Sequence, residues 1–586
     1  MRWNIKENKH SIESTNFINH KDDIEMSGEK VSMIISYEVD KDGFLKIGRK
    51  LIYPMYRTIP NDTYSSYMFD YNHNLILNIR ERFVKVVIDG TLTIYSETDE
   101  YNIIHRFYPS TEYPIAYEQI QVTKKKHCID PMYINTGRIN TLVGYEGVIH
   151  TDLNMAKEGD FLTFSFTTHF SNESASKEKD SYIKRMARVN ELINECDLDT
   201  GYSVLDTVFA FAKVRVGESI YNTRNGKINS PGGGNYYAGV WTNDQCEYST
   251  PWFAYTNDGN ELEAAFNAMD WFEKYMNDKG EPLVSSIISE GMSYWNSSGD
   301  RGDASMYLYG NTMLYLIRGE TPDQRHHKML EWAANYIESK ILDEGVVYSD
   351  TDELEGRLSL GINLSTSSLS YGAFMEYATL NERMGLTSKA SKYRELAYKI
   401  SQGIESYFGG NIKGYETYHY HKECSEIRAW NCLPLYMGIR NRSQDTIISI
   451  DKLLWVNESL KSTESENIVW DRSALYYIAA LFRCGESDNA WDRLIELSTN
   501  RLLGDRVPYA IEAWPEYNMR HLSAESALFA RIITDGLLNI TFNKDGFAIN
   551  PSLPKSIKNM SIKNIYICGN YYDIFIKNGN VKLFHK

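Results

Sequence analysis

The sequence predicts a multidomain protein with an N-terminal β-sandwich, a central (α/α)6 toroid of six helical hairpins and a small C-terminal β-sheet. The prediction depends on two changes of hydrophobic periodicity. Short runs of β-branched and aromatic residues, separated by turn residues, fill the first part of the chain and return at its end. Between them, apolar residues recur at the i, i+3 and i+4 spacing of helices.

The N-terminal part contains closely spaced strand-like segments, for example 31–39 and 162–170. Many short strands with turn signals between them are typical of a sandwich, so we expect this fold for residues 1–171. The next segment, 172–200, is charged and compatible with helix, and we expect a linker with one helix there.

Residues 201–539 carry twelve helical patterns. Twelve helices in one body form six antiparallel hairpins that can close into a ring. A helical bundle or an open solenoid of helix pairs is the alternative, and the lack of a repeat of fixed length disfavours the solenoid. The patterns span 203–222, 245–256, 259–278, 301–318, 322–341, 365–385, 388–408, 427–438, 444–455, 470–483, 486–500 and 521–537.

The last part of the chain, 540–586, is predicted to form the small β-sheet as a cap. The runs 562–568 and 572–576 are expected to pair as neighbouring strands, and 581–584 is expected to add a third.

The composition is that of an ordinary globular protein. Of 586 residues, 42% are hydrophobic and 24% are charged, which excludes a largely disordered chain. The 62 Lys and Arg residues against 78 Asp and Glu residues give a formal charge of −16, which disfavours nucleic acid as a partner. Aromatic residues make up 13%; their faces can stack on sugar rings, although they also fill cores.

Targeting signals are not visible in the sequence. It contains no apolar run of 18 residues and no apolar leader segment at its N-terminus. None of its seven cysteines forms a CxxC pair, which indicates reduced thiols rather than a disulfide frame or a zinc site. We therefore expect a cytoplasmic location, no organic cofactor, no metal and no membrane partner, while self-association as a homo-oligomer stays open.

Four loops with acidic and aromatic residues each precede a predicted helix, and a pocket in a toroid opens among the loops at one end. In the first loop, 232–245, three glycines precede Tyr236, Tyr237, Trp241 and Asp244. An Asp at a helix start can simply cap the helix. Four large aromatic or acidic residues behind a glycine run favour a binding role instead.

The other three loops add clustered charges. Crowded carboxyl groups raise one another's pKa, which suits a general acid, whereas charges spread over a surface would form only solvated ion pairs. Asp471 and Arg472, at a further predicted helix start, are as consistent with a helix cap as with a pocket wall. The second loop contains Asp300, Arg301 and Asp303, the third contains Asp352, Glu353, Glu355 and Arg357, and the fourth contains Glu512, Trp514, Glu516, Arg520 and His521.

Two carboxyl groups on opposite sides of a sugar can cleave a glycosidic bond. One protonates the leaving oxygen and the other deprotonates the attacking water, with the groups roughly 6.5–9.5 Å apart when the configuration inverts and closer when it is retained. Acidic loops from distant parts of a toroid can supply such a pair. The residues alone leave inversion and retention open.

The order and spacing of these motifs resemble the six-hairpin glycosidase superfamily, which includes glucoamylases, trehalases and maltose phosphorylase-type enzymes. Residues 241–244 are similar to the Trp-x-Arg-Asp segment of glucoamylases, with Asn243 in place of the sugar-gripping Arg. The segment from Asp300 to Asp303 is similar to the next helix entry of the family. The likeness covers roughly residues 200–540 and consists of motifs in the same order.

The resemblance also implies catalytic roles. Glu355 fits the position of the general acid best and Glu353 next, because a helix start rich in Ser and Thr follows them. Glu512 resembles the general base that activates water, because it precedes a Leu-Ser-Ala helix start at the family's spacing. Glu516 is the reserve candidate for the base.

We therefore expect an exo-acting glycoside hydrolase that removes a terminal sugar from an oligosaccharide or glycoside, with inversion implied by the resemblance. An inverting phosphorylase, a polysaccharide lyase and a non-catalytic carbohydrate-binding protein are the alternatives. They would be recognised by phosphate dependence, by an unsaturated product and by absent turnover. The expected sugar-binding residues are Tyr237, Trp241, Asn243, Asp244, Asp300, Arg301, Asp303, Arg357, Trp514, Arg520 and His521.

Overall fold

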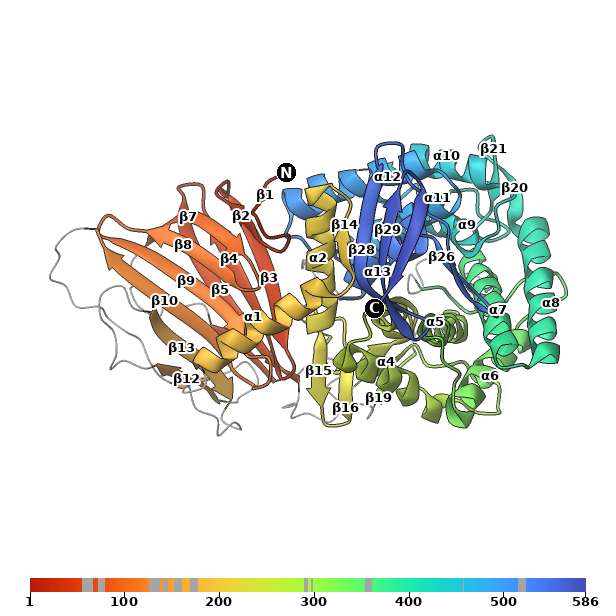
Figure 1. Ribbon diagram of the computed structural model, residues 1–586, viewed down its shortest axis with the longest axis horizontal. Coiled ribbons are helices and arrows are strands. Elements are labelled where there is room, and N and C mark those ends of the chain that lie inside the picture. Colours follow the sequence, from red (N-terminus) through yellow and green to blue (C-terminus); the bar gives the residue numbers. More distant parts are fainter. Residues whose placement is uncertain are drawn as a thin grey trace.

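The structure is a computed structural model that describes residues 1–54, 67–71, 80–125, 138–140, 146–151, 161–168, 178–234, 236–288, 293–296, 299–353, 361–456, 458–514 and 523–586. It confirms the predicted order of a sandwich-like β region, a helical region and a small C-terminal sheet. The β region occupies one end of the long axis and the helices occupy the other (Figure 1).

The N-terminal region is a large antiparallel sheet folded over on itself. Its 13 described strands are β1 (Asn4–Ile5), β2 (Ile12–Ser14), β3 (His20–Gly28), β4 (Val31–Val39), β5 (Phe44–Tyr53), β6 (Tyr67–Tyr71), β7 (Glu81–Ile88), β8 (Leu92–Glu97), β9 (Tyr101–Pro109), β10 (Ala116–Lys124), β11 (Arg138–Asn140), β12 (Glu146–Thr151) and β13 (Phe161–Thr168). They follow the order β11-β12-β13-β10-β9-β8-β7-β5-β4-β3, with β1, β2 and β6 at the margins. Strands β3 and β4 pack against β9, so the two halves face each other as in a sandwich.

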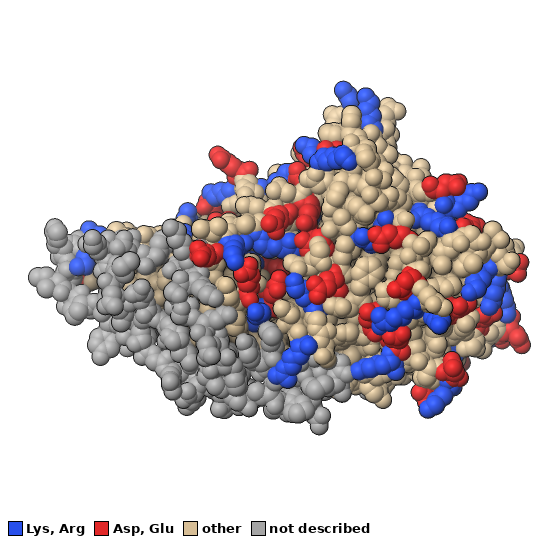
Figure 2. Space-filling model, turned by 60° about the horizontal axis from the view of Figure 1, so that its bottom comes forward, with Lys and Arg blue, Asp and Glu red and all other residues tan. Residues whose placement is uncertain are grey.

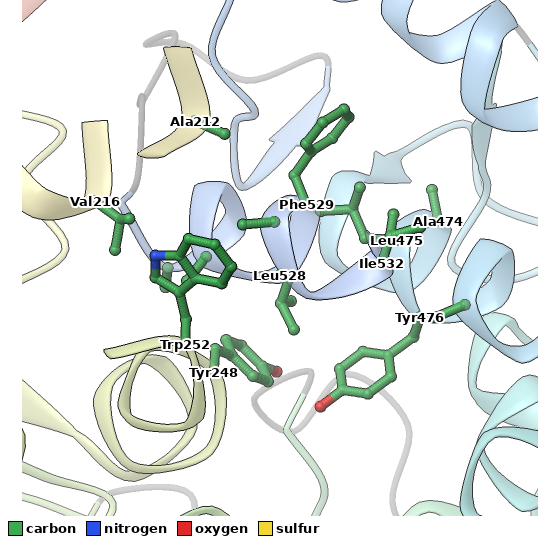
Figure 3. Close-up of a cluster of buried hydrophobic side chains, with 14 of the residues drawn as sticks. Ala212, Val216, Tyr248, Trp252, Ala474, Leu475, Tyr476, Leu528, Phe529 and Ile532 are labelled. Carbon is green, nitrogen blue, oxygen red and sulfur yellow. The ribbon is translucent and has the colours of Figure 1, made fainter. Parts of the chain in front are cut away.

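The helical region contains an inner ring that is buried on almost every face. Consecutive members pack against one another, and the last packs against the first, which closes the ring. The apolar side chains between η4, α3, α11 and α13 include Tyr248, Trp252, Tyr476 and Leu528 (Figure 3). The ring consists of η4 (Thr242–Ser249) with α3 (Thr250–Thr256), α5 (Asp303–Arg318), α7 (Leu364–Arg383), η8 (Ala429–Cys432) with α9 (Leu433–Met437), α11 (Asp471–Arg483), and α13 (Ser523–Arg531) with η10 (Ile532–Leu537).

A second layer of helices alternates with this ring along the chain, which gives the predicted hairpins. Most outer helices bury one stripe only; in α12, for example, Ala490, Trp491 and Leu494 are the buried residues. The exception is α2, which lies between the helical region and the β region and is buried almost throughout. The outer helices are α2 (Ser203–Glu218), α4 (Gly259–Trp271), α6 (Gln324–Ser339), α8 (Thr387–Gly403), α10 (Ser443–Leu453) and α12 (Ser487–Glu496).

The C-terminal sheet lies against the end of the ring where the inner helices finish. The Cys568 amide donates to the carbonyl of Ile317 in the last turn of α5 at 2.6 Å. The sheet has the order β14-β28-β29-β30, and its first strand comes from the segment expected to be a linker, after helix α1 (Glu178–Asn194). The strands are β14 (Asp197–Asp199), β28 (Asn559–Ile567), β29 (Asn570–Lys577) and β30 (Asn580–His585), and β26 (Ile540–Asn543) with β27 (Gly546–Ile549) forms a separate hairpin.

Because each hairpin is antiparallel, the inner helices all run in one direction, and the loops before them meet at the opposite end from the C-terminal sheet. Short strands bind some of these loops together. They are β17 (Val240–Trp241), β18 (Ser286–Ile288) and β19 (Ser293–Trp295), and β24 (Val469–Trp470) with β25 (Ala513–Trp514).

The surface carries both signs of charge. Acidic and basic side chains are interspersed over the described face in Figure 2, so the net negative charge is not gathered into one patch there. Among the described helices, none combines the length and apolar character that crossing a membrane requires.

Candidate active site

Acidic side chains converge on one buried arginine at the end of the ring where the inner helices begin. The guanidinium of Arg472 lies 2.6 Å from Glu525 Oε1, 3.3 Å from Glu353 Oε1, 3.5 Å from Asp244 Oδ1 and 4.0 Å from Glu512 Oε1. Arg472 is 3% exposed and Glu353 is 1% exposed, whereas Glu512 is half-buried. These five residues, the Arg472 cluster, come from four different loops or helix starts.

The local structure explains why carboxylates gather here. Asp244 lies in the first turn of η4, and Glu525 lies in the first turn of α13. The N-termini of helices carry partial positive charge, which stabilises nearby carboxylates. Pairing of β24 with β25 brings Glu512, just before β25, next to Arg472, just after β24.

The loop that carries Glu353 is held from both sides. Asp352 accepts a hydrogen bond from the hydroxyl of Tyr420. Further along the loop, Asn363 caps α7 by accepting from the Thr366 amide at 2.8 Å, and its Nδ2 donates to Ser349 Oγ at 2.9 Å. Glu353 therefore sits in a loop anchored to α7 on one side and to a neighbouring tyrosine on the other.

Burial and crowding raise the pKa of carboxyl groups in the cluster. Desolvation, followed by repulsion from Glu247, raises the pKa of Glu353 to about 8, against the opposing attraction of Arg472. Desolvation likewise raises the pKa of Glu247 to about 7, that of Asp244 well above its usual range, and that of Glu525. At neutral pH, Glu353 is thus a protonated carboxyl group that can donate a hydrogen bond or a proton.

Several polar atoms around the cluster lack hydrogen-bond partners within the described residues. They are Asn243 Oδ1, Glu247 Oε2 and Glu525 Oε2, all buried. Asn243 contacts Glu353 through Nδ2 at 3.5 Å. Buried polar groups in folded proteins almost always have partners, so unpaired acceptors at one place are a feature of a ligand site.

Trp241 and Tyr237, predicted to bind sugar, lie in the glycine-rich segment before η4. Trp241 pairs with Ser286 in the sheet of β17 and β18, and its ring edge packs against Tyr236 at 5.4 Å between centroids. It leads directly to Asn243 and Asp244 of the site. Tyr237 is instead fully buried against the β region, where its hydroxyl donates to Glu25 of β3 at 2.9 Å.

Asp300, Arg301 and Asp303 form a buried network at the start of α5. Arg301 Nη2 donates to Asp303 Oδ1 at 3.0 Å, and the other oxygen of Asp303 accepts from Ser285 at 2.9 Å. Asp300 accepts from the Tyr336 hydroxyl at 2.7 Å, and burial raises its pKa to about 6. The structure therefore brings these three predicted residues together, and the contacts listed here join them to other protein side chains.

Five of the predicted site residues lie outside the described residues: Glu355, Arg357, Glu516, Arg520 and His521. For Trp514 the structure gives the backbone, paired with Val469, but not the side chain. The predicted acids that the structure brings together are therefore Glu353 and Glu512, with Asp244.

Sequence reasoning did not select the centre of the site. The sequence leaves Arg472 equally consistent with a helix cap and a pocket wall, and it does not single out Glu525 or Glu247. The available signal for Glu247 is its position, because it is an acidic residue three positions after Asp244 at the same predicted helix start. Glu247 also accepts a hydrogen bond from Tyr476 of α11, which the sequence does not reveal.

Within the described part of the chain, no group of three His, Cys, Asp or Glu side chains could hold a metal ion.

Comparisons with solved structures show the same fold. One similar structure is assigned as a kojibiose phosphorylase from the human microbiome, with a TM-score of 0.56 and 11% identity, covering 100% of this chain and 96% of that one. A bacterial glucoamylase complexed with acarbose has a TM-score of 0.57 and 11% identity, covering 88% and 95%. A sialidase has a TM-score of 0.51 and 12% identity, and the match covers 98% of this chain but 58% of the sialidase. Neither the protein-family models nor the curated proteins contain a match.

These likenesses confirm the predicted resemblance at the level of fold. The class that they define is the six-hairpin glycosidase fold, with a β region before the helical ring and a small sheet after it. At 11–12% identity they establish the architecture, and the chemistry has to be argued from the site itself.

Proposed function

We propose that this protein is an exo-acting glycoside hydrolase that removes a terminal sugar with inversion of configuration. One observation carries the proposal: the buried Glu353 and the more exposed Glu512 both lie within 4.0 Å of the same guanidinium. That arrangement is compatible with the separation of about 5–9.5 Å at which two carboxyl groups act on one glycosidic bond. The glucoamylase fold gives independent support.

In this mechanism Glu353 is the general acid. Its raised pKa keeps the proton available at neutral pH for transfer to the glycosidic oxygen. Glu355 is the other candidate from the sequence, and it lies outside the described residues. Glu512, half-buried and beside Arg472, takes the proton from the attacking water.

The first test is hydrolysis of a panel of α- and β-linked nitrophenyl glycosides and short oligosaccharides by the wild type. On the glycoside that is cleaved, Glu353→Gln and Glu512→Gln should each lower kcat by about 10²–10⁴-fold. Glu376→Gln is the matched control, because burial also raises the pKa of this glutamate, on α7, to about 7. It should retain wild-type activity. Product anomers observed by NMR during turnover then report inversion.

Three results would contradict the proposal. Full activity of both Gln variants would remove the acid–base pair, and an ultraviolet-absorbing unsaturated product would indicate a lyase. Binding of sugars without turnover by the wild type would indicate a carbohydrate-binding protein.

An inverting phosphorylase is the second candidate, favoured by the match to a kojibiose phosphorylase along the whole chain. In that reaction phosphate replaces water, so no base is needed. Glu512 argues against it, because a carboxylate repels the incoming anion. Turnover measured with and without inorganic phosphate separates the two: a hydrolase is indifferent to phosphate, and a phosphorylase depends on it.

A further inference from the structure

The C-terminal sheet has a hollowed outer face. One side of the sheet packs on α3 and α5, with Ile562, Ile574 and Ile576 buried. Because side chains alternate along a strand, Phe575 and its neighbours at every second position point to the other side. That side lines a hollow of about 1330 Å³. Its lining comes from all four strands, β14, β28, β29 and β30, and from Gly201.

Two phenylalanines in this hollow have solvent-exposed rings. Phe575 is 38% exposed and Phe584 is 55% exposed, and their ring centroids are 5.5 Å apart at an interplanar angle of 88°. They come from adjacent strands, where Asp573 is the partner of Phe584 and Lys582 is the partner of Phe575. Adjacent exposed aromatic rings in a concave surface are a feature of interaction sites rather than of ordinary surface.

The side chains around the two rings have unused hydrogen-bonding capacity. Within the described residues, none of the following makes a side-chain hydrogen bond or ion pair: Asn559, Ser561, Lys577, Asn580 and Lys582. Their registers place Asn559 and Asn580 on either side of Lys577, and Ser561 beside Phe575. Flat apolar rings are thus surrounded by free amide, hydroxyl and ammonium groups.

We propose that this face is a second carbohydrate-binding site, which holds an oligosaccharide or polysaccharide chain apart from the Arg472 cluster. Sugar rings present apolar C–H faces with hydroxyl groups around their edges. The phenyl rings suit the faces, and the free amides, hydroxyl and ammonium groups suit the edges. The inference rests on the proposed function for its ligand class, since a glycoside hydrolase acts on such chains.

Charge and strand position favour a sugar chain over a second copy of the protein. Lys577 and Lys582 lie beside the rings, and the same hollow contains Asp199 and Asp573, the latter paired with Lys586 at 3.0 Å, so the local charge is close to balanced, which suits a neutral ligand. Lysine is depleted in protein–protein interfaces. Lys582 also lies on β30, the edge strand, where a charged side chain opposes the addition of a further strand.

The face is far from the proposed catalytic residues. The sheet contacts the last turn of α5, whereas the loops of the Arg472 cluster lie beyond the first turn of the inner helices. The 16 residues of α5 span roughly 24 Å at 1.5 Å per residue. A chain bound to the sheet would therefore keep the enzyme near its substrate without occupying the active site.

The test is affinity electrophoresis of the full chain in gels that contain amylopectin, arabinoxylan, β-glucan or galactomannan. All proteins carry Glu512→Gln to prevent turnover. We expect retardation by one polysaccharide, and a dissociation constant at least tenfold weaker when Phe575→Ala and Phe584→Ala are combined. Leu583→Ala is the matched control, because Leu583 is 45% exposed on the same strand but points to the opposite side. It should bind like its parent.

Separate readouts keep the outcomes distinct. In chains with Glu512 intact, the Phe variants should hydrolyse small nitrophenyl glycosides at the wild-type rate, and melting temperatures should confirm folding. Equal retardation of parent and double variant, or no retardation by any of the four polysaccharides, would overturn the second site. A dimer in sedimentation that the double variant loses would also overturn it, in favour of a second copy. If the polysaccharide binds but no glycoside is cleaved, the second site stands and the proposed hydrolase fails.

Discussion

Glu25 of strand β3 accepts a hydrogen bond from the hydroxyl of Tyr237 at 2.9 Å, across the boundary between the β region and the helical region. Its other oxygen accepts from the Gly233 amide at 3.0 Å and pairs with Arg215 of α2 at 2.9 Å. A Cβ at Gly232, where φ is +82°, would lie 2.7 Å from the guanidinium of Arg215, so only glycine fits there. The β region thus fixes the segment that leads to Trp241.

Removing the ion pair of Glu25 with Arg215 should loosen the glycine-rich segment that leads to Trp241. In Glu25→Gln the charge that holds Arg215 is lost, so we expect kcat/KM to fall about tenfold, mainly through KM, because small displacements of positioning groups have large kinetic effects. Glu118→Gln is the control. Glu118 is also a buried carboxylate paired with an arginine, Arg49, and its other side-chain partner among the described residues is His105, also in the β region. In Glu118→Gln we expect the melting temperature to fall about as much as in Glu25→Gln, without a change in KM. An equal change of KM in both variants would contradict the prediction.

The activity should depend on one group that titrates near pH 8. The pKa of Glu353 is raised from its ordinary 4.5 to about 8, so the general acid loses its proton as the pH rises through that value. We expect kcat to fall on the alkaline side with an apparent pKa of about 8, measured with a glycoside whose leaving group needs protonation. A substrate with a highly acidic leaving group should show a weaker dependence. An unchanged rate up to pH 9.5 would exclude Glu353 as the acid.

The same shift makes a stability prediction of definite sign. In the folded protein Glu353 holds its proton up to about pH 8, whereas in the unfolded chain it loses it near 4.5. The stabilisation is complete below pH 4.5 and is lost as the pH rises to 8, by about 1.4 kcal/mol for each pKa unit. Glu353→Gln cannot titrate, so its unfolding free energy, relative to the wild type, should increase between pH 5 and 8. Urea denaturation at both pH values measures the difference.

Arg472 should contribute most to folding stability above neutral pH, where the carboxyl groups around it ionise. Among the described residues, Arg472 is the arginine that contacts Glu353, Glu525 and Asp244. Removing it leaves the ionised members of this group uncompensated, which costs about 3–5 kcal/mol. Arg472→Met should therefore lose stability at pH 8 and recover part of it at pH 5, because more of these carboxyl groups hold a proton at the lower pH. Arg493→Met, which breaks two partly exposed ion pairs, with Glu496 on α12 and with Asp451 on α10, should cost less than about 1 kcal/mol at both pH values. Chemical denaturation of both variants tests this contrast.

The stability that the β region contributes should also depend on pH. His105 lies buried between Glu81 at 2.9 Å and Glu118 at 3.2 Å, and these carboxylates raise its pKa from 6.5 to about 9 in spite of its desolvation. The stabilisation is complete below pH 6.5 and is lost as the pH rises through about 9. We expect the melting temperature of the wild type to fall between pH 6.5 and 9.5. His105→Gln should flatten that fall, and an equally steep fall in the variant would contradict the assignment.

Local patterns predicted the elements well. The helical period placed segments at 301–318 and 365–385, and the structure has α5 at Asp303–Arg318 and α7 at Leu364–Arg383. Hydrophobic periodicity and turn residues are properties of short sequence segments. They are therefore readable even for a helix that is buried on all sides in the ring. The strand β14 was missed because three residues, Asp197–Asp199, carry too little pattern to be recognised; only their pairing with β28 makes them a strand.

The site was predicted less completely. The acidic loops predict Glu353, Glu512 and Asp244 as site residues, and all three lie within 4.0 Å of Arg472. The same reasoning placed Tyr237 with the substrate, whereas its hydroxyl contacts the β region through Glu25. A side chain's direction depends on the neighbour that it packs against, and that neighbour here is about 200 positions away in the sequence.

The sequence by itself determined the order of the three regions, the position of nearly every helix, and the loops that carry acidic residues, because composition and periodicity are local. The tertiary structure alone decided that Arg472 is the common partner of Asp244, Glu353 and Glu512, which come from three of those loops, and that burial raises the pKa of Glu353 to about 8. Both depend on burial and on charges brought together from positions 119 residues apart. Desolvation and Coulomb repulsion exist only once the chain has folded around them.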